Sequence, residues 1–169
     1  MSWTTLEGMN NLEIREESTD TRLKVTTTVP APVEDVWDLL RRPSSHAEID
    51  GSGMIRAAVG QEPIEYVDQM FVMEMLWTDG TTRYRTDNYV TRYDPERCIE
   101  WLVADEGQDP AGWKWGWLLQ TAPDNSTRVT NYCDWTEVTD QEVLDQKGFP
   151  LVDASKVQAT LRNLANALS

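Results

Sequence analysis

Residues that could do chemistry at a metal or as a nucleophile are few in this chain. Histidine occurs once, at His46, and the two cysteines, Cys98 and Cys133, lie far apart and form no Cys-x-x-Cys pair. A two-histidine iron or zinc site therefore cannot form, and the cysteines lack the spacing of metal ligands. His46 lies in a segment that fits a short surface helix, with no signature of a serine nucleophile, so a structural role is favoured over catalysis. We expect no bound metal and no cofactor.

Tryptophan is the abundant residue with binding potential, since the chain has eight Trp and only two Phe. Trp113, Trp115 and Trp117 alternate along one predicted strand and therefore share a face. Trp101 and Trp135 fall on neighbouring predicted strands. Core packing alone would explain any single ring. Taken together, the rings indicate a wall that partly faces a flat apolar ligand.

Polar residues interrupt the apolar faces of three predicted strands. Asn88 and Asn131 share the parity of apolar neighbours, and a buried amide without a partner costs about 1–3 kcal/mol. A ligand or a trapped water could supply that partner, although an outward or locally paired amide is equally compatible with the pattern, because a bulge changes the parity. Glu74 interrupts a strand in the same way. If inward it could act as a general acid or base, but an outward, solvated Glu is favoured.

The period-two pattern brings the inner faces of five strands to one space, where an apolar wall with few polar anchors is typical of a small-molecule site. No catalytic residue can be assigned from the sequence. The predicted ligand-binding residues are Met73, Met75, Tyr84, Asn88, Trp101, Trp115, Trp117, Asn131, Cys133 and Trp135.

These residues need a sheet and a helix to position them. An alternating, β-branched strand spans Arg22 to Val29, and Pro32 then opens a helix with an apolar stripe up to Leu40. A short second helix is expected over Ser44 to Glu48, and a long amphipathic helix over Pro150 to Leu168. Between them, turn signals about ten residues apart predict antiparallel strands at 54–59, 68–77, 82–93, 98–104, 113–121 and 127–138.

The local sequences resemble the START-like superfamily, also called the polyketide cyclase/dehydrase or birch-pollen-allergen-like helix-grip superfamily. The resemblance covers about residues 20–168 and is closest to small actinobacterial-type members. The matching segments are 25–40 (VTTTVPAPVEDVWDLL), 43–53 (PSSHAEIDGSG), 127–130 (TRVT), 134–135 (DW), 148–150 (GFP) and 160–164 (TLRNL).

This resemblance implies an α+β helix-grip fold. A curved antiparallel sheet of about seven strands would wrap around the long C-terminal helix, with two short helices after the first strand and a deep apolar cavity. We expect an N-terminal extension over residues 1–20, partly loose, and one START-like domain over residues 21–169. The metal-bearing branch of the superfamily uses His and carboxylate ligands, which a chain with one histidine does not supply.

Composition excludes several other classes. The 169 residues carry 29 Asp and Glu against 15 Lys and Arg, a net charge of −14, which repels phosphate backbones and anionic lipid surfaces. Nucleic-acid partners and membrane insertion are therefore not expected. Residues 1–12 lack the basic and apolar stretches of a signal peptide, which predicts a cytoplasmic protein. We expect it to be a monomer or a homodimer.

The sequence favours a module that binds a small hydrophobic or aromatic molecule, lipid-like or polyketide-like, between the sheet and the C-terminal helix. One alternative is a metal-free cyclase or dehydratase acting on such a molecule in the same cavity. Another is a protein-interaction adaptor with no cavity ligand, which tryptophans packing the cavity shut would favour.

Overall fold

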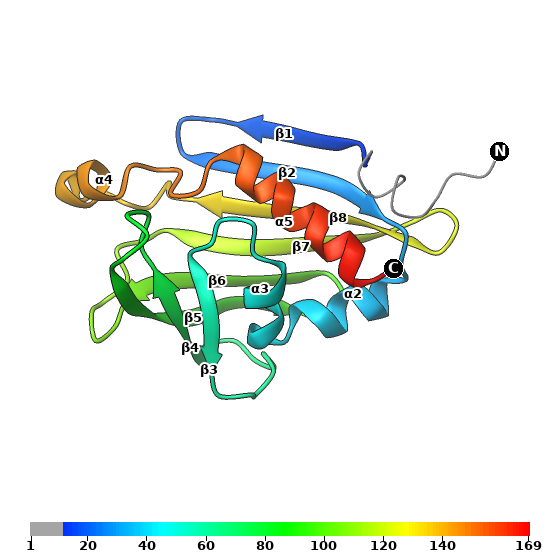
Figure 1. Ribbon diagram of the computed structural model, residues 1–169, viewed down its shortest axis with the longest axis horizontal. Coiled ribbons are helices and arrows are strands. Elements are labelled where there is room, and N and C mark those ends of the chain that lie inside the picture. The colour runs from blue at the N-terminus through cyan, green and yellow to red at the C-terminus, as the bar shows by residue number, and fades with distance from the viewer. Residues whose placement is uncertain (1–11) are drawn as a thin grey trace.

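One antiparallel sheet organises the structure, a computed structural model that describes residues 12–169. Its eight strands are hydrogen-bonded in the order β1-β2-β8-β7-β6-β5-β4-β3, and Figure 1 shows helix α5 lying across the sheet near β2 and β8. The strands are β1 (Ile14–Ser18), β2 (Arg22–Val29), β3 (Ile55–Val59), β4 (Met70–Leu76), β5 (Arg83–Asp94), β6 (Cys98–Asp105), β7 (Lys114–Ala122) and β8 (Ser126–Asp134).

Alternation along the strands decides which side chains face the helix. In β2, Leu23, Val25, Thr27 and Val29 are buried while the residues that alternate with them are more exposed, as a strand with one covered face requires. Val25 lies opposite Asn131 of β8, and Asn131 lies opposite Trp117 of β7. The covered face therefore continues from β2 across β8 and β7, and the predicted inner residues Asn131 and Trp117 share it.

Four helices complete the described structure: α2 (Val33–Leu40), α3 (Pro43–Ile49), α4 (Gln141–Lys147) and α5 (Ala154–Ala167). Asp153 caps the start of α5 by accepting a hydrogen bond from the backbone N–H of Lys156. Leu161 and Leu164, on the apolar side of α5, are completely buried. Burial of this stripe against the sheet is the main reason that the helix is held there.

The turn after α3 is fixed to α5 through close backbone contact. The Gly51 N–H donates to Thr160 Oγ1 at 2.9 Å, and the Asn163 amide donates to the Ile49 carbonyl at 3.0 Å. A β-carbon at Gly51 would lie only 2.6 Å from the Lys156 carbonyl oxygen. Glycine is required here because the turn approaches the helix backbone.

The outer face of the sheet has a close approach of its own. The Tyr132 ring lies over Gly116, where a β-carbon would come within 2.4 Å of it. The Tyr132 hydroxyl donates to the Glu100 carboxylate, which also accepts a hydrogen bond from Thr91 Oγ1 at 2.7 Å. Burial, followed by the hydrogen bond and charge of Glu100, raises the pKa of Tyr132. These polar groups bond to one another on the side of the sheet away from α5.

The structure confirms the predicted fold. The strand predicted over 127–138 ends earlier, at Asp134, and two further elements differ from those expected. The sheet has eight strands instead of about seven, because Ile14–Ser18 pairs with β2 as an edge strand. Residues 14–18 of the predicted, partly loose extension thus form a strand of the sheet, whereas its residues 1–11 lie outside the described residues. Helix α4 was not predicted. Neither element shows an apolar period, since β1 is mostly exposed and α4 buries no side chain.

Candidate functional site

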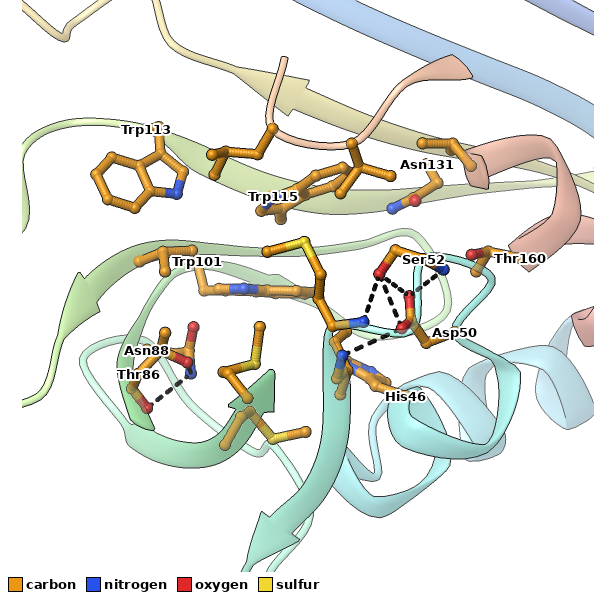
Figure 2. A pocket seen from close by; sticks show the side chains of 18 of the residues that line it. His46, Asp50, Ser52, Thr86, Asn88, Trp101, Trp113, Trp115, Asn131 and Thr160 are labelled. Atoms are coloured by element: carbon orange, nitrogen blue, oxygen red, sulfur yellow. Dashed lines mark hydrogen bonds between the residues drawn. The ribbon is translucent and has the colours of Figure 1, made fainter. Parts of the chain in front are cut away.

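A cavity of about 120 Å³ lies between the sheet and its cover of α3, α5 and the segment that precedes α5. Figure 2 shows Trp113 and Asp50 on opposite sides of this space, with Trp101 and Trp115 between them. The apolar side chains that line it are Ile49, Met54, Ile55, Phe71, Met73, Met75, Trp77, Trp101, Val103, Trp113, Trp115, Trp117, Leu151, Val152 and Val157. The polar ones are His46, Asp50, Ser52, Tyr84, Thr86, Asn88, Asp105, Asn131, Lys147 and Thr160.

The structure brings eight of the ten predicted ligand-binding residues to this cavity. Cys133 and Trp135 are buried but are not among the lining residues. Cys133 lies opposite Trp115 within the sheet, and Trp135 follows the end of β8 and stacks on Phe149 at 5.6 Å between ring centroids. The eight that line the cavity are Met73, Met75, Tyr84, Asn88, Trp101, Trp115, Trp117 and Asn131. Ligand binding by these residues stays a prediction.

The middle of the cavity has an aromatic wall that includes His46. Its ring stacks on Trp101 at 5.3 Å between centroids and meets the Phe71 ring edge-on at 6.4 Å. The His46 Nε2 atom is 2.6 Å from the Leu40 carbonyl oxygen. Because that oxygen only accepts hydrogen bonds, Nε2 carries the proton and Nδ1 keeps a lone pair when the ring is neutral. Burial lowers the pKa of His46, so the neutral ring is favoured.

The position of His46 differs from the surface position expected from the sequence. Its side chain is 5% exposed and holds the end of α2 to α3 through the Leu40 contact, which is a structural role. The same side chain also lines the cavity. A single histidine among small polar residues carries no sequence signal that would reveal this second position.

At the α3 end of the cavity, defined by Asp50 and Ser52, the polar groups bond to one another. The Asp50 carboxylate accepts hydrogen bonds from the Ser52 N–H at 3.1 Å, the Ser52 hydroxyl at 2.8 Å and the Ile55 N–H at 3.1 Å. Ser52 Oγ in turn accepts from the Met54 N–H. Figure 2 shows this network as dashed lines. Its acceptors are used to shape the turn into β3.

Asn88 and Asn131 both point inward, and each amide group already donates within the protein. The Asn131 amide donates to the Gly116 carbonyl at 2.9 Å. The Asn88 amide donates to the Phe71 carbonyl at 3.1 Å and to Thr86 Oγ1 at 3.1 Å. Both side chains therefore support strand geometry first. Their Oδ1 atoms receive no hydrogen bond from any described residue, which leaves acceptors beside the cavity.

At the α4 end, defined by Lys147 and Trp113, the polar groups have fewer hydrogen-bond partners within the protein. The Lys147 ammonium nitrogen lies 5.3 Å from the Trp77 ring centroid and 5.4 Å from that of Trp113, distances typical of a cation–π contact. It also lies 3.4 Å from an Asp105 carboxylate oxygen. Burial, with a contribution from Asp105, raises the pKa of Tyr84 to about 12, so its hydroxyl is neutral near pH 7.

Most buried polar groups of this cavity are hydrogen-bonded within the protein, and Trp113 is the exception. Its side chain is 4% exposed, and its indole Nε1–H is buried without a hydrogen-bond partner among the described residues. Buried polar groups are normally paired. An unpaired donor in a cavity wall is therefore a position where a ligand acceptor would be stabilised.

Other polar and metal-binding candidates do not converge here. The prediction that Glu74 points outward is confirmed, since it is half-exposed and pairs with Arg85 at 3.2 Å. Within residues 12–169, no group of three His, Cys, Asp or Glu side chains is arranged to hold a metal ion. In the same range, no helix combines the length and the apolar character that a membrane span needs.

Solved structures define the fold class. Protein Ms6760 from Mycobacterium smegmatis superposes with a TM-score of 0.64 at 18% identity, covering 92% of this chain and 96% of that one. A major latex-like protein from Panax ginseng gives 0.62 at 15% identity, covering 87% and 96%. DynU16, from the dynemicin biosynthetic locus, gives 0.55 at 20% identity, covering 89% of this chain and 49% of its own. The chain thus has the helix-grip fold of START-like and birch-pollen-allergen-like proteins.

Sequence comparison does not assign an activity to the chain. No family model matches the chain. An uncharacterized protein of Mycobacterium tuberculosis strain H37Rv, Rv0088, is 26% identical over 149 residues, which are 86% of this chain and 63% of that protein. The chain therefore spans less than two thirds of the curated relative's length, and its function has to be argued from the cavity.

Proposed function

We propose that the protein binds a small hydrophobic or aromatic molecule in the cavity between the sheet and α5. The observation that carries this proposal is the composition of the lining: seven Phe, Trp and Tyr side chains, three methionines and several aliphatic ones surround a few polar atoms. Such a lining is typical of sites for small apolar molecules. Methionine side chains adapt to irregular ligands, and the packed tryptophans leave a space, which a pure adaptor would not need.

The ligand would lie against Trp101 and Trp115, which face each other across the β6–β7 pair. Large aromatic faces favour a flat, aromatic guest over a flexible chain of the same volume, because offset and edge contacts between rings add to burial. The helix-grip fold by itself does not select among binding, catalysis and adaptor roles.

The test is equilibrium dialysis of the protein against fluorene, a flat apolar probe. We expect saturable binding at one site per chain. Met75→Trp would fill the cavity and abolish binding, whereas Met70→Trp, on the opposite face of the same strand and 50% exposed, would leave it unchanged. Native mass spectrometry of protein purified without denaturation would report any retained molecule. Absence of fluorene binding, or binding that Met75→Trp does not affect, contradicts the proposal.

A cyclase-type or dehydratase-type enzyme is the second candidate, favoured by the position of His46. The neutral ring keeps a lone pair on Nδ1, and the Leu40 carbonyl fixes the orientation of the ring. A base held beside an aromatic guest could remove a proton next to a carbonyl group. Wild-type protein would then exchange the α-protons of 2-tetralone for deuterium, followed by NMR, and His46→Gln would bind the ketone without exchange. If exchange is no faster than in buffer, the enzyme candidate fails and the binding role stands.

A further inference from the structure

The cavity contains one hydrogen-bond donor that no described residue satisfies. Trp113 Nε1–H is buried, and the Trp113 ring packs against Phe149 at 5.5 Å between centroids, which holds it in place. In Figure 2 its indole nitrogen lies on the side of the ring nearer Trp115. An indole N–H only donates. Whatever satisfies it must bring an acceptor into the cavity.

A second donor lies beside the first. Lys147 Nζ is 5.4 Å from the Trp113 ring centroid, and its side chain is only 18% exposed. Its carboxylate contact to Asp105 is long, at 3.4 Å, and an ammonium group has three N–H bonds to donate. Two donors, one neutral and one charged, therefore flank the same end of an otherwise apolar space.

The other polar side chains of the cavity show that this arrangement is local. Asp50 accepts three hydrogen bonds at the α3 end, and the amide groups of Asn88 and Asn131 donate to backbone oxygens. The Asp50 carboxylate and the two amide NH₂ groups are committed to the fold, and what Asn88 and Asn131 leave beside the cavity are acceptors, not donors. Among the described residues, only the α4 end has a buried side-chain donor without a hydrogen-bond partner.

We propose that the α4 end binds an oxygen acceptor on the edge of the ligand, through Trp113 Nε1–H with Lys147 Nζ beside it. This inference rests on the proposed function and narrows the ligand to a flat apolar molecule bearing a carbonyl or carboxylate oxygen. Satisfying a donor that is already desolvated gives selectivity, because a ligand without the acceptor leaves the N–H unpaired. A neutral carbonyl would depend mainly on Trp113, and a carboxylate would depend on Lys147 as well.

The experiment compares fluorene with 9-fluorenone, which has nearly the same shape and one added carbonyl, and with fluorene-9-carboxylate. Dissociation constants are measured for wild type, Trp113→Phe, Trp135→Phe and Lys147→Met. We expect the ratio of the fluorene and fluorenone constants to fall about tenfold in Trp113→Phe, the worth of one hydrogen bond. Solvation of the free ligands cancels when that ratio is compared between wild type and Trp113→Phe. Trp135→Phe, whose ring packs on the same Phe149 outside the cavity, keeps the wild-type ratio.

The variants distinguish a carbonyl ligand from a carboxylate ligand. They also distinguish failure of this inference from failure of the proposed function. A selective loss of carboxylate binding in Lys147→Met identifies an anionic ligand, and a loss confined to Trp113→Phe identifies a neutral carbonyl. If fluorene binds and the ratio is the same in wild type and Trp113→Phe, the inference is wrong while the proposed function stands. If neither ligand binds, both are wrong. Should Trp113→Phe not fold, the assigned Trp113 Nε1–H resonance of wild type must move downfield with fluorenone and not with fluorene; equal shifts overturn the inference.

Discussion

The two ends of the cavity use polar residues in opposite ways. At the α3 end, the Asp50 carboxylate, Ser52 and nearby backbone N–H groups satisfy one another, and Gly51 lets the turn touch α5. At the α4 end, Trp113 Nε1–H has no partner among the described residues, and Lys147 is held by a long ion pair and two ring faces. A polar residue in a cavity is therefore a candidate for ligand recognition only after its bonds within the protein have been counted. This comparison predicts that substitutions at the α3 end change stability, whereas substitutions at the α4 end change binding.

The largest effect is expected at Gly51. Gly51→Ala would place a β-carbon 2.6 Å from the Lys156 carbonyl oxygen and 2.7 Å from Ala159 Cβ, so the turn after α3 would have to move away from α5. We expect the free energy of unfolding to fall by about 3 kcal/mol, as for overpacked cores, measured by urea denaturation. A loss below about 1 kcal/mol would mean that the α3 end is not rigid and that the comparison is wrong.

Asp50→Ala should have the next largest effect. It leaves the N–H groups of Ser52 and Ile55 without their carboxylate partner, at a cost of about 2 kcal/mol. Asp50→Asn keeps one acceptor oxygen in place and should lose about half as much. Equal, small losses in both variants would show that water replaces the carboxylate, and the α3 end would then be as adaptable as the α4 end.

Trp113→Phe should change stability far less than its burial suggests. The smaller ring loses apolar contact, but the substitution also removes an unpaired buried donor, and the two effects oppose each other. We expect a change of less than about 1 kcal/mol in the same urea measurement. A loss above about 2 kcal/mol would reveal a partner for the indole N–H and would remove the contrast between the ends.

The smallest predicted effect is a pH dependence from His46, which lies between the ends. Burial lowers its pKa in the folded protein, so the unfolded chain binds the proton more tightly. Stability from this group is present above the unfolded pKa of about 6.5 and is lost as the pH falls towards the folded value, by at most about 1.4 kcal/mol per pH unit. Urea titrations at pH 7.5 and 5.5 should show wild type losing more stability than His46→Gln. Equal losses in the two proteins would contradict this prediction.

The sequence predicts the fold better than the site, for physical reasons. Period-two alternation predicts both bounds of β2 correctly. It also predicts the inward parity of Asn131 and Trp117, because one face of each strand is covered. The same rule counted Cys133 as a lining residue, although parity fixes a face and not which part of that face stays uncovered. Trp135 lies beyond the end of β8, where strand parity no longer applies.

His46 and Lys147 show what local pattern cannot provide. His46 reaches the cavity because α3 packs near β3 and α5, which is a tertiary contact. Lys147 ends helix α4, which has no fully buried side chain and therefore no hydrophobic periodicity that would predict it from the sequence. The cap residues Asp140 and Gly148 are the only recognisable signals of this helix. The unpaired state of Trp113 Nε1 depends on the absence of any nearby acceptor, and no spacing rule encodes that.

Helix α4 has a kinetic consequence for any guest. None of its side chains is fully buried, and only Val143 and Leu144 pack partly buried against the core. Lifting α4 therefore uncovers less apolar surface than releasing α5, and it breaks the Lys147 contacts with Asp105, Trp77 and Trp113. Such contacts are worth about 1–3 kcal/mol together, against a global stability of about 5–15 kcal/mol for ordinary domains. Local opening at this end is therefore far more frequent than release of α5. The residence time of a bound molecule would then depend on the Lys147 contacts and on the partial burial of Val143 and Leu144, and would depend less on how stable the rest of the fold is.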